Sequence, residues 1–187
     1  GWRDEPLYAQ NFPLKCGKGS AYEGGIREPM IVRWPGTVQP GTRCNDYLII
    51  EDFYPSILEM AGIDDYDVPQ EIDGISFVPL LKQTKNHSHG RSLYWNCPNI
   101  WGEKGPGIGP SFTIRKDNWK MIYFYETGEK ELYDIPNDIE ENNNVAALYP
   151  QIINKLSKEL GKFLRQTNGQ RPYFKKTGKP CPWPDEI

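Results

Sequence analysis

The sequence has no long apolar run and no large excess of charge of either sign. None of its hydrophobic stretches approaches the roughly 18 residues that a membrane-spanning helix requires. Lysine and arginine number 22 against 25 aspartates and glutamates, which gives a formal net charge of −3. Proteins that bind nucleic acid or anionic lipid by electrostatics need a surplus of basic residues. The composition therefore predicts neither a membrane span nor a nucleic-acid partner.

Closely spaced metal ligands are also missing. The chain has only two histidines, in one polar segment, and four cysteines without a C-x-x-C pair: Cys16, Cys44, Cys97 and Cys181. This spacing argues against zinc ribbons and thioredoxin-like redox sites. The shortage of histidine argues against a Ser-His-Asp triad. The cysteines allow two disulfides in three alternative pairings, and four unpaired thiols are the other alternative.

No secretory signal opens the chain. The residues after Gly1 lack the basic, apolar and small-residue sections of a signal peptide, so we expect either a cytoplasmic chain or a true beginning elsewhere.

Turn-forming residues, by contrast, are abundant, with 18 glycines and 17 prolines among 187 residues. They favour short elements joined by many turns and disfavour a helical bundle.

The first half of the chain predicts one buried strand and one helix. Residues 29–36 form a short apolar run closed by Pro-Gly, which is typical of a strand followed by a turn. We expect a helix over residues 53–61, with Asp52 as its N-cap and Gly62 ending it. Its predicted apolar face consists of Phe53, Ile57, Leu58 and Ala61. Residues 82–90 contain no apolar side chain and mark the predicted domain boundary.

The second half predicts a sheet and a helix. Short apolar runs joined by brief polar links indicate an antiparallel meander over residues 92–95, 112–115, 119–125 and 131–135. After Pro150, apolar residues at helical spacing predict a helix over about residues 150–167, which Asn168-Gly169 can end. We expect this amphipathic helix to cover one face of the sheet.

Three further motifs have ordinary interpretations. Residues 105–109 (GPGIG) are similar to a phosphate-binding glycine loop, but no helix follows whose N-terminus could meet a phosphate. The acidic and amide residues over 134–141 lack the pattern of a calcium loop, so we interpret them as a solvated turn. Asn86-His87-Ser88 fits a glycosylation acceptor, a triplet too common to discriminate between functions.

The segment around Lys18 carries the clearest chemistry. Lys18 stands between Gly17 and Gly19, and Gly24-Gly25 follows shortly before the apolar run. Glycines let the backbone approach a ligand closely, and a lysine projects a point positive charge. This arrangement suits a tetrahedral anion such as sulfate or phosphate. A structural turn with an exposed lysine is the alternative interpretation.

Six segments follow one another in a recognisable order: residues 17–36 (GKGSAYEGGIREPMIVRWPG), 52–62 (DFYPSILEMAG), 73–81 (DGISFVPLL), 93–95 (LYW), 114–125, and 131–135 with 138–143 (ELYDI, DIEENN). Together they resemble the sulfatase family, most closely its arylsulfatase and N-acetylgalactosamine-6-sulfatase type. The resemblance spans roughly residues 14–165 and begins with a match to the second family signature.

The resemblance implies which site residues this chain supplies. By position, Lys18 corresponds to the family lysine that contacts the sulfate group, where it would neutralise charge on the sulfate and the transition state. Substrate contacts are implied for Trp95 and for Asn96, which stands where many relatives have histidine. The Cys16 position is half of a disulfide in some relatives, but the turn after Tyr125 holds no cysteine, so we expect no bridge there. A bridge from Cys16 to Cys97 stays open.

The resemblance also implies what lies outside this chain. Family members use a formylglycine made within a C/S-x-P-x-R motif, and no cysteine or serine here stands in such a motif. The family's calcium ligands lie earlier in the sequence than the lysine signature, so we expect no metal ligands in this chain. The implied partners are the remainder of the catalytic domain and a sulfate-ester substrate, with sulfated carbohydrate favoured.

Together these expectations describe the C-terminal portion of a sulfatase. Residues 1–90 would complete the α/β catalytic domain of the alkaline-phosphatase-like fold, and residues 91–187 would form an α+β subdomain. The parent would be a sulfuric ester hydrolase with calcium and formylglycine, in the periplasm, secreted or in lysosomes, and this chain alone would be inactive. A non-catalytic binding or assembly module and a fragment of a related phosphatase or phosphodiesterase are the alternatives.

Overall fold

The computed structural model describes residues 11–63, 65, 67–84, 90–99 and 105–187. The glycosylation triplet at 86–88 and both histidines lie outside the described residues. The chain divides into two compact units, one formed by the N-terminal segment up to Glu28 together with Ser92–Ile187 and the other by Pro29–Arg91. Residues 11–28 thus group with the sheet, whereas the predicted domain boundary near residue 90 falls next to the end of the second unit. The assignment of the two family domains stays a prediction.

The predicted meander is confirmed. The strands β1 (Ser92–Cys97), β2 (Ser111–Lys116), β3 (Trp119–Phe124) and β4 (Lys130–Asp134) form one antiparallel sheet in the order β1-β2-β3-β4. Tyr94 pairs with Ile114, and Ile114 in turn pairs with Met121. Buried hydrophobic side chains occur on both faces of β3, and β2 buries four consecutive residues. Consecutive burial of this kind indicates that both faces of the sheet are covered.

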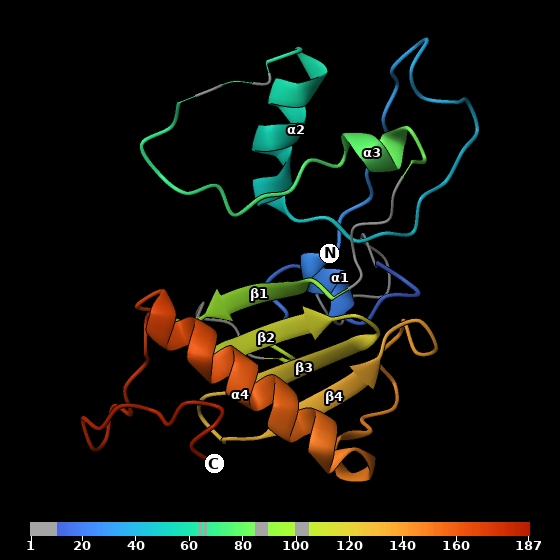
Figure 1. The fold of residues 1–187 in the computed structure, drawn as a ribbon. Helices are drawn as coiled ribbons and strands as arrows, with labels where there is room; N and C mark the ends of the chain where they lie inside the picture. Colours follow the sequence, from blue (N-terminus) through green and yellow to red (C-terminus); the bar gives the residue numbers. More distant parts are fainter. Residues whose placement is uncertain (1–10, 64, 66, 85–89, 100–104) are drawn as a thin grey trace. The chain divides into compact units, whose positions relative to one another are not determined.

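The helix α4 (Pro150–Gln166) covers one face, as predicted, and runs diagonally across the strands (Figure 1). It packs Leu156, Leu160 and Leu164 against Phe112 and Ile114, among other buried residues of the main core. The short 3-10 helix η2 (Ala146–Leu148) precedes it. The helix ends where expected, because Asn168 adopts the left-handed conformation (φ 49) and the Gly169 N–H donates to the Leu164 carbonyl at 2.8 Å.

The segment of residues 11–28 covers the other face. It contains the single-turn helix α1 (Glu23–Ile26), and its Tyr22 joins Ile122 and Tyr133 in a second buried cluster. Along β3 the residues alternate, so that Met121 faces α4 whereas Ile122 faces this segment. The N-terminal segment is therefore held directly on the sheet.

The Pro29–Arg91 unit contains η1 (Ile50–Asp52), α2 (Phe53–Met60) and α3 (Val78–Leu81). The predicted helix and its stop at Gly62 (φ 71) are confirmed, but two details of the prediction were wrong. The Asp52 carboxylate does not cap the helix, because it accepts hydrogen bonds from the backbone N–H groups of Ile49 and Ile75 instead. Ile57 is 57% exposed, since the helix buries Pro55 and Ser56.

The strand predicted over residues 29–36 is not formed. These residues are extended up to a turn at Pro35-Gly36, where the Val38 N–H donates to the Trp34 carbonyl at 2.9 Å. Ile31 is 95% exposed. A strand requires neighbours to pair with, and within the described part of the chain this segment has none. The apolar run therefore shows the pattern of a strand without a sheet to join.

Candidate functional site

Lys18 lies on a closed loop, residues 15–24, hereafter the lysine loop. Its two ends meet where the Gly24 N–H donates to the Lys15 carbonyl at 3.0 Å, and the Ser20 N–H closes a turn onto the Gly17 carbonyl at 3.1 Å. Lys18 is exposed, and the next residue, Gly19, has φ +87. This backbone suits glycine and leaves the Lys18 side chain directed to solvent at the turn. The loop can thus present one positive charge to an anion.

The Gly24-Gly25 pair is required by close backbone packing. A Cβ at Gly24 would lie 2.3 Å from the Cys16 carbonyl oxygen, and one at Gly25 would lie 2.1 Å from the Ser20 carbonyl oxygen. No larger residue fits at either position without movement of the backbone. Glycine in this part of the signature therefore shapes the lysine loop rather than contacting a ligand.

The GPGIG segment supports the same loop. The Ala21 N–H donates to the Gly107 carbonyl at 2.9 Å, and Gly107 adopts φ +67. A Cβ at Gly107 would lie 2.6 Å from the Ser20 hydroxyl and equally close to the Tyr22 ring. This packing role agrees with the prediction that residues 105–109 do not form a nucleotide-binding loop. The contact between residues 105–109 and the lysine loop was not predictable, because the two segments are far apart along the chain.

A buried charged cluster beneath the loop was missed by the sequence analysis, and the interpretation of residues 134–141 as a solvated turn was wrong for Glu141, which is fully buried. The side chain of Lys120, on β3, is 0% exposed and pairs with Glu23 at 3.0 Å and Glu141 at 2.8 Å. Arg115 on β2 also approaches Glu23, at 3.4 Å. Burial raises the pKa of Glu141, although the charge of Lys120 and its hydrogen bond oppose the increase. A lysine in a strand is normally expected at the surface, so only the tertiary structure reveals this cluster.

Two tyrosines, Tyr22 in the lysine loop and Tyr133 on β4, share one carboxylate. The hydroxyls of Tyr22 and Tyr133 each donate to Glu131 at 2.9 Å. Burial and the neighbouring negative charge of Glu131 raise the pKa of both phenols far above the usual value. Both therefore stay protonated, and neither can serve as a general base near neutral pH.

The structure separates the two predicted substrate contacts. Asn96 accepts a hydrogen bond from the Tyr125 hydroxyl at 3.4 Å and donates one to the Gln170 carbonyl at 3.3 Å, on the α4 face of the sheet. Because side chains alternate along a strand, Trp95 lies on the face that carries the lysine loop. The fold brings Trp95, but not Asn96, to the side of Lys18. Their roles in substrate binding stay predictions.

The structure contains no disulfide among its cysteines. All four cysteines are thiols, so the bridge between Cys16 and Cys97 is not formed.

The carboxylates near the lysine loop do not form a metal site. Within the described ranges, no group of three or more His, Cys, Asp or Glu side chains is placed to hold a metal ion. Glu23 and Glu141, at the base of the loop, are occupied by Lys120. The carboxylates in the described part of the chain therefore do not fit the family's calcium.

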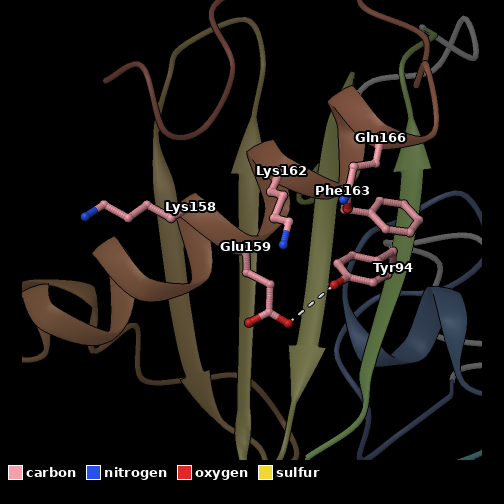
Figure 2. Close-up of a pocket in the computed structure, with 6 residues that line it drawn as sticks. All are labelled: Tyr94, Lys158, Glu159, Lys162, Phe163 and Gln166. Carbon is pink, nitrogen blue, oxygen red and sulfur yellow. Dashed lines mark hydrogen bonds between the residues drawn. The ribbon is translucent and has the colours of Figure 1, made fainter.

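A surface hollow of about 450 Å³ lies beside α4 (Figure 2). The Tyr94 and Phe163 rings stack there at 3.8 Å, and Glu159 pairs with Lys116 at 2.8 Å. Burial alone would raise the pKa of Glu159, but hydrogen bonds from Lys116 and Ser92 hold it below its usual value. The hollow is on the sheet face opposite the lysine loop and is therefore separate from the Lys18 site.

Among the described residues, no helix is both long and apolar enough to cross a membrane.

Comparisons with known proteins agree with the sequence signature. The sequence profile of the family described as "N-sulphoglucosamine sulphohydrolase, C-terminal" matches residues 16–167, which include the lysine loop except Lys15, the sheet and α4. A sulfatase of Formosa agariphila is 29% identical over 187 residues, which cover 93% of this chain and 33% of the relative. An N-acetylglucosamine-6-O-sulfatase of Bacteroides thetaiotaomicron is 30% identical, with 80% of this chain and 26% of the relative covered.

The solved structures give the same result. The crystal structure of Ps i-CgsB in complex with k-i-k-neocarrahexaose matches with a TM-score of 0.71 and 29% identity, covering 83% of this chain and 32% of that one. The chain thus spans about a third of the length of the relatives it matches. The predicted resemblance and the fold class, with its antiparallel sheet and C-terminal helix, are confirmed. The chain belongs to the sulfatase family and corresponds to its C-terminal portion.

Proposed function

We propose that this chain is the C-terminal part of an enzyme that hydrolyses sulfate esters of carbohydrates, and that Lys18 contacts the sulfate group. The observation that carries the proposal is the exposed Lys18 on a loop closed by backbone hydrogen bonds and fixed by glycines, in a chain of the sulfatase family. Two of the similar proteins support the substrate class, one named an N-acetylglucosamine-6-O-sulfatase and the other crystallised with k-i-k-neocarrahexaose.

The chemistry of a lysine ammonium suits this role. Its three N–H donors and compact charge can approach sulfate oxygens from a flexible stem. As the ester bond breaks, negative charge increases on the leaving oxygen and the sulfate, and a fixed cation stabilises that charge more in the transition state than in the substrate. The nucleophile and calcium of the proposed reaction lie outside this chain, which contains no C/S-x-P-x-R motif.

The test is a Lys18→Ala variant of the full-length protein. We expect kcat/KM for an aryl sulfate and for a sulfated oligosaccharide to fall about 10²- to 10³-fold, the scale for removing one charge-stabilising donor. Lys176→Ala is the matched control, because Lys176 is an exposed lysine in the C-terminal tail. An unchanged kcat/KM in Lys18→Ala, with the control also unchanged, would reject the sulfate contact.

Two further measurements address the alternatives and the location. Parallel assays with an aryl phosphate separate a sulfatase from a phosphatase or phosphodiesterase, and a full-length protein that binds sulfated glycan without turnover would be a binding module.

We also propose that the parent protein works in the periplasm, outside the cell or in lysosomes. The encoding reading frame tests this, because such a protein should begin with a cleavable signal segment.

A further inference from the structure

The proposed function assigns no role to the buried cluster of Lys120, Glu23 and Glu141. Lys120 and Glu141 have fully buried side chains, and that of Glu23 is only 3% exposed. One ammonium group lies between two carboxylates, at 3.0 Å from Glu23 and 2.8 Å from Glu141. Removing three charged groups from water is costly, and apolar residues of similar volume often stabilise a fold equally well. Stability alone therefore explains this cluster poorly.

Glu141 makes contacts at both ends of the lysine loop. At the first end, the Lys15 ammonium donates to the Glu141 backbone carbonyl at 2.8 Å and lies 4.0 Å from the centre of the Tyr22 ring. At the second end, the Glu23 backbone N–H donates to the Glu141 carboxylate at 2.6 Å. The residues that precede and follow Lys18 are thus attached to the same residue.

Lys120 connects this attachment to the sheet. It belongs to β3, the strand whose neighbouring residues Met121 and Ile122 are fully buried on opposite faces. Its ion pair orients the Glu141 carboxylate that receives the Glu23 N–H, and Arg115 on β2 holds the second Glu23 oxygen at 3.4 Å. Two central strands therefore determine where the loop ends lie.

We propose that Glu141 and Lys120 are positioning residues, which act on sulfate-ester hydrolysis through Lys18 by fixing both ends of the lysine loop. This inference rests on the proposed function. Neither side chain touches substrate, because both are buried beneath the loop. Their effect is geometric: the Lys18 ammonium must meet the sulfate oxygens in a narrow range of positions, and a displacement of about 1 Å can reduce a rate by about 10²-fold.

A double-mutant cycle in the full-length protein tests this proposal. The variants are Glu141→Gln, Lys18→Ala and their combination, and kcat/KM for an aryl sulfate is measured for each. Glu141→Gln removes the charge and retains the shape of the side chain. We expect it to lower kcat/KM about 10- to 100-fold when Lys18 is present and less than about twofold in the Lys18→Ala background. The matched control is Glu140→Gln, which neutralises the neighbouring carboxylate that pairs with Asn142 rather than Lys120.

The outcomes distinguish this proposal from the proposed function. Equal losses from Glu141→Gln in both backgrounds would show a general structural effect and overturn the positioning role, as would no loss at all. An unchanged kcat/KM in Lys18→Ala would overturn the proposed function, and this inference with it. If Glu141→Gln does not fold, Lys15→Met replaces it in the cycle, because it removes only the attachment at the first end of the loop and leaves the buried ion pairs intact. The same expected coupling and the same contrary results then apply.

Discussion

Arg91 holds Asp52 through two parallel hydrogen bonds, with Nη1 donating to Oδ2 at 2.8 Å and Nη2 donating to Oδ1 at 2.7 Å. The same carboxylate accepts the backbone N–H groups of Ile49 and Ile75. Asp52 is fully buried, and each of its two oxygens accepts two hydrogen bonds, so that the carboxylate as a whole is held by three separate segments of the Pro29–Arg91 unit. This carboxylate links the start of α2 to the residues before α3 and to the end of the unit.

We predict that Asp52→Asn destabilises the protein by roughly 3–5 kcal/mol, because it leaves the Arg91 guanidinium without its charged partner in a mostly buried position. Urea unfolding of full-length wild type and variant measures the difference. Asp67→Asn serves as the control, since Asp67 is exposed in the same unit. Equal unfolding midpoints for wild type and Asp52→Asn would contradict the prediction.

The same ion pair predicts a dependence of stability on pH. Burial alone would raise the pKa of Asp52, but the hydrogen bonds from Arg91, Ile75 and Ile49 outweigh it and hold the pKa below its ordinary value. The stabilisation is therefore complete above the unfolded-state pKa of about 3.9 and is lost as the pH falls through the lower folded-state value. Thermal unfolding between pH 6 and pH 2 should show this loss for wild type and a smaller one for Asp52→Asn.

Gly24→Ala should distort the lysine loop. The added methyl group would meet the backbone oxygens of Cys16 and Lys15 at 2.3 and 2.4 Å, so we expect a loss of about 1–3 kcal/mol in stability. We also expect a lower kcat/KM, because the backbone that carries Lys18 must move. In the control Gly41→Ala, the methyl group meets nothing within 4 Å and only the left-handed backbone (φ +74) opposes it. A kcat/KM like that of Gly41→Ala would argue against the tight packing of the loop.

Lys120→Met should be strongly destabilising. The methionine fills a similar volume, but Glu23 and Glu141 lose the ammonium group between them, and two buried carboxylates then face each other. We expect a loss of roughly 3–5 kcal/mol by chemical unfolding. Lys155→Met, at an exposed position on α4, controls for the change of residue type. If both variants unfolded at the same denaturant concentration, the buried ion pairs would contribute little.

Residues 1–187 alone should not hydrolyse sulfate esters. The chain has no C/S-x-P-x-R motif, and the described residues include no cluster of metal ligands. The measurement is turnover of an aryl sulfate by the purified chain against a heat-inactivated sample, with full-length protein as the positive control. Turnover by the chain above the inactivated sample, from a preparation free of other sulfatases, would refute this expectation.

The regular elements were predictable because their sequences carry a local period. Leu156, Leu160 and Leu164 repeat at helical spacing in α4, and the strands are short and separated by brief polar links. Lys18 became a candidate sulfate contact from its glycine neighbours and the family signature, and this role stays a prediction. The buried cluster was not predictable, because Glu23, Lys120 and Glu141 look like surface residues until the fold brings them together. The strand at residues 29–36 was predicted from a pattern that depends on neighbours for its hydrogen bonds.

The exposed isoleucines of the Pro29–Arg91 unit affect how the chain can be produced. Ile31, Ile50 and Ile57 are more than half exposed, and association between molecules would remove such apolar side chains from water. A preparation of residues 1–187 by itself should therefore scatter more light as its concentration rises, and in cells it should be retained by chaperones or degraded.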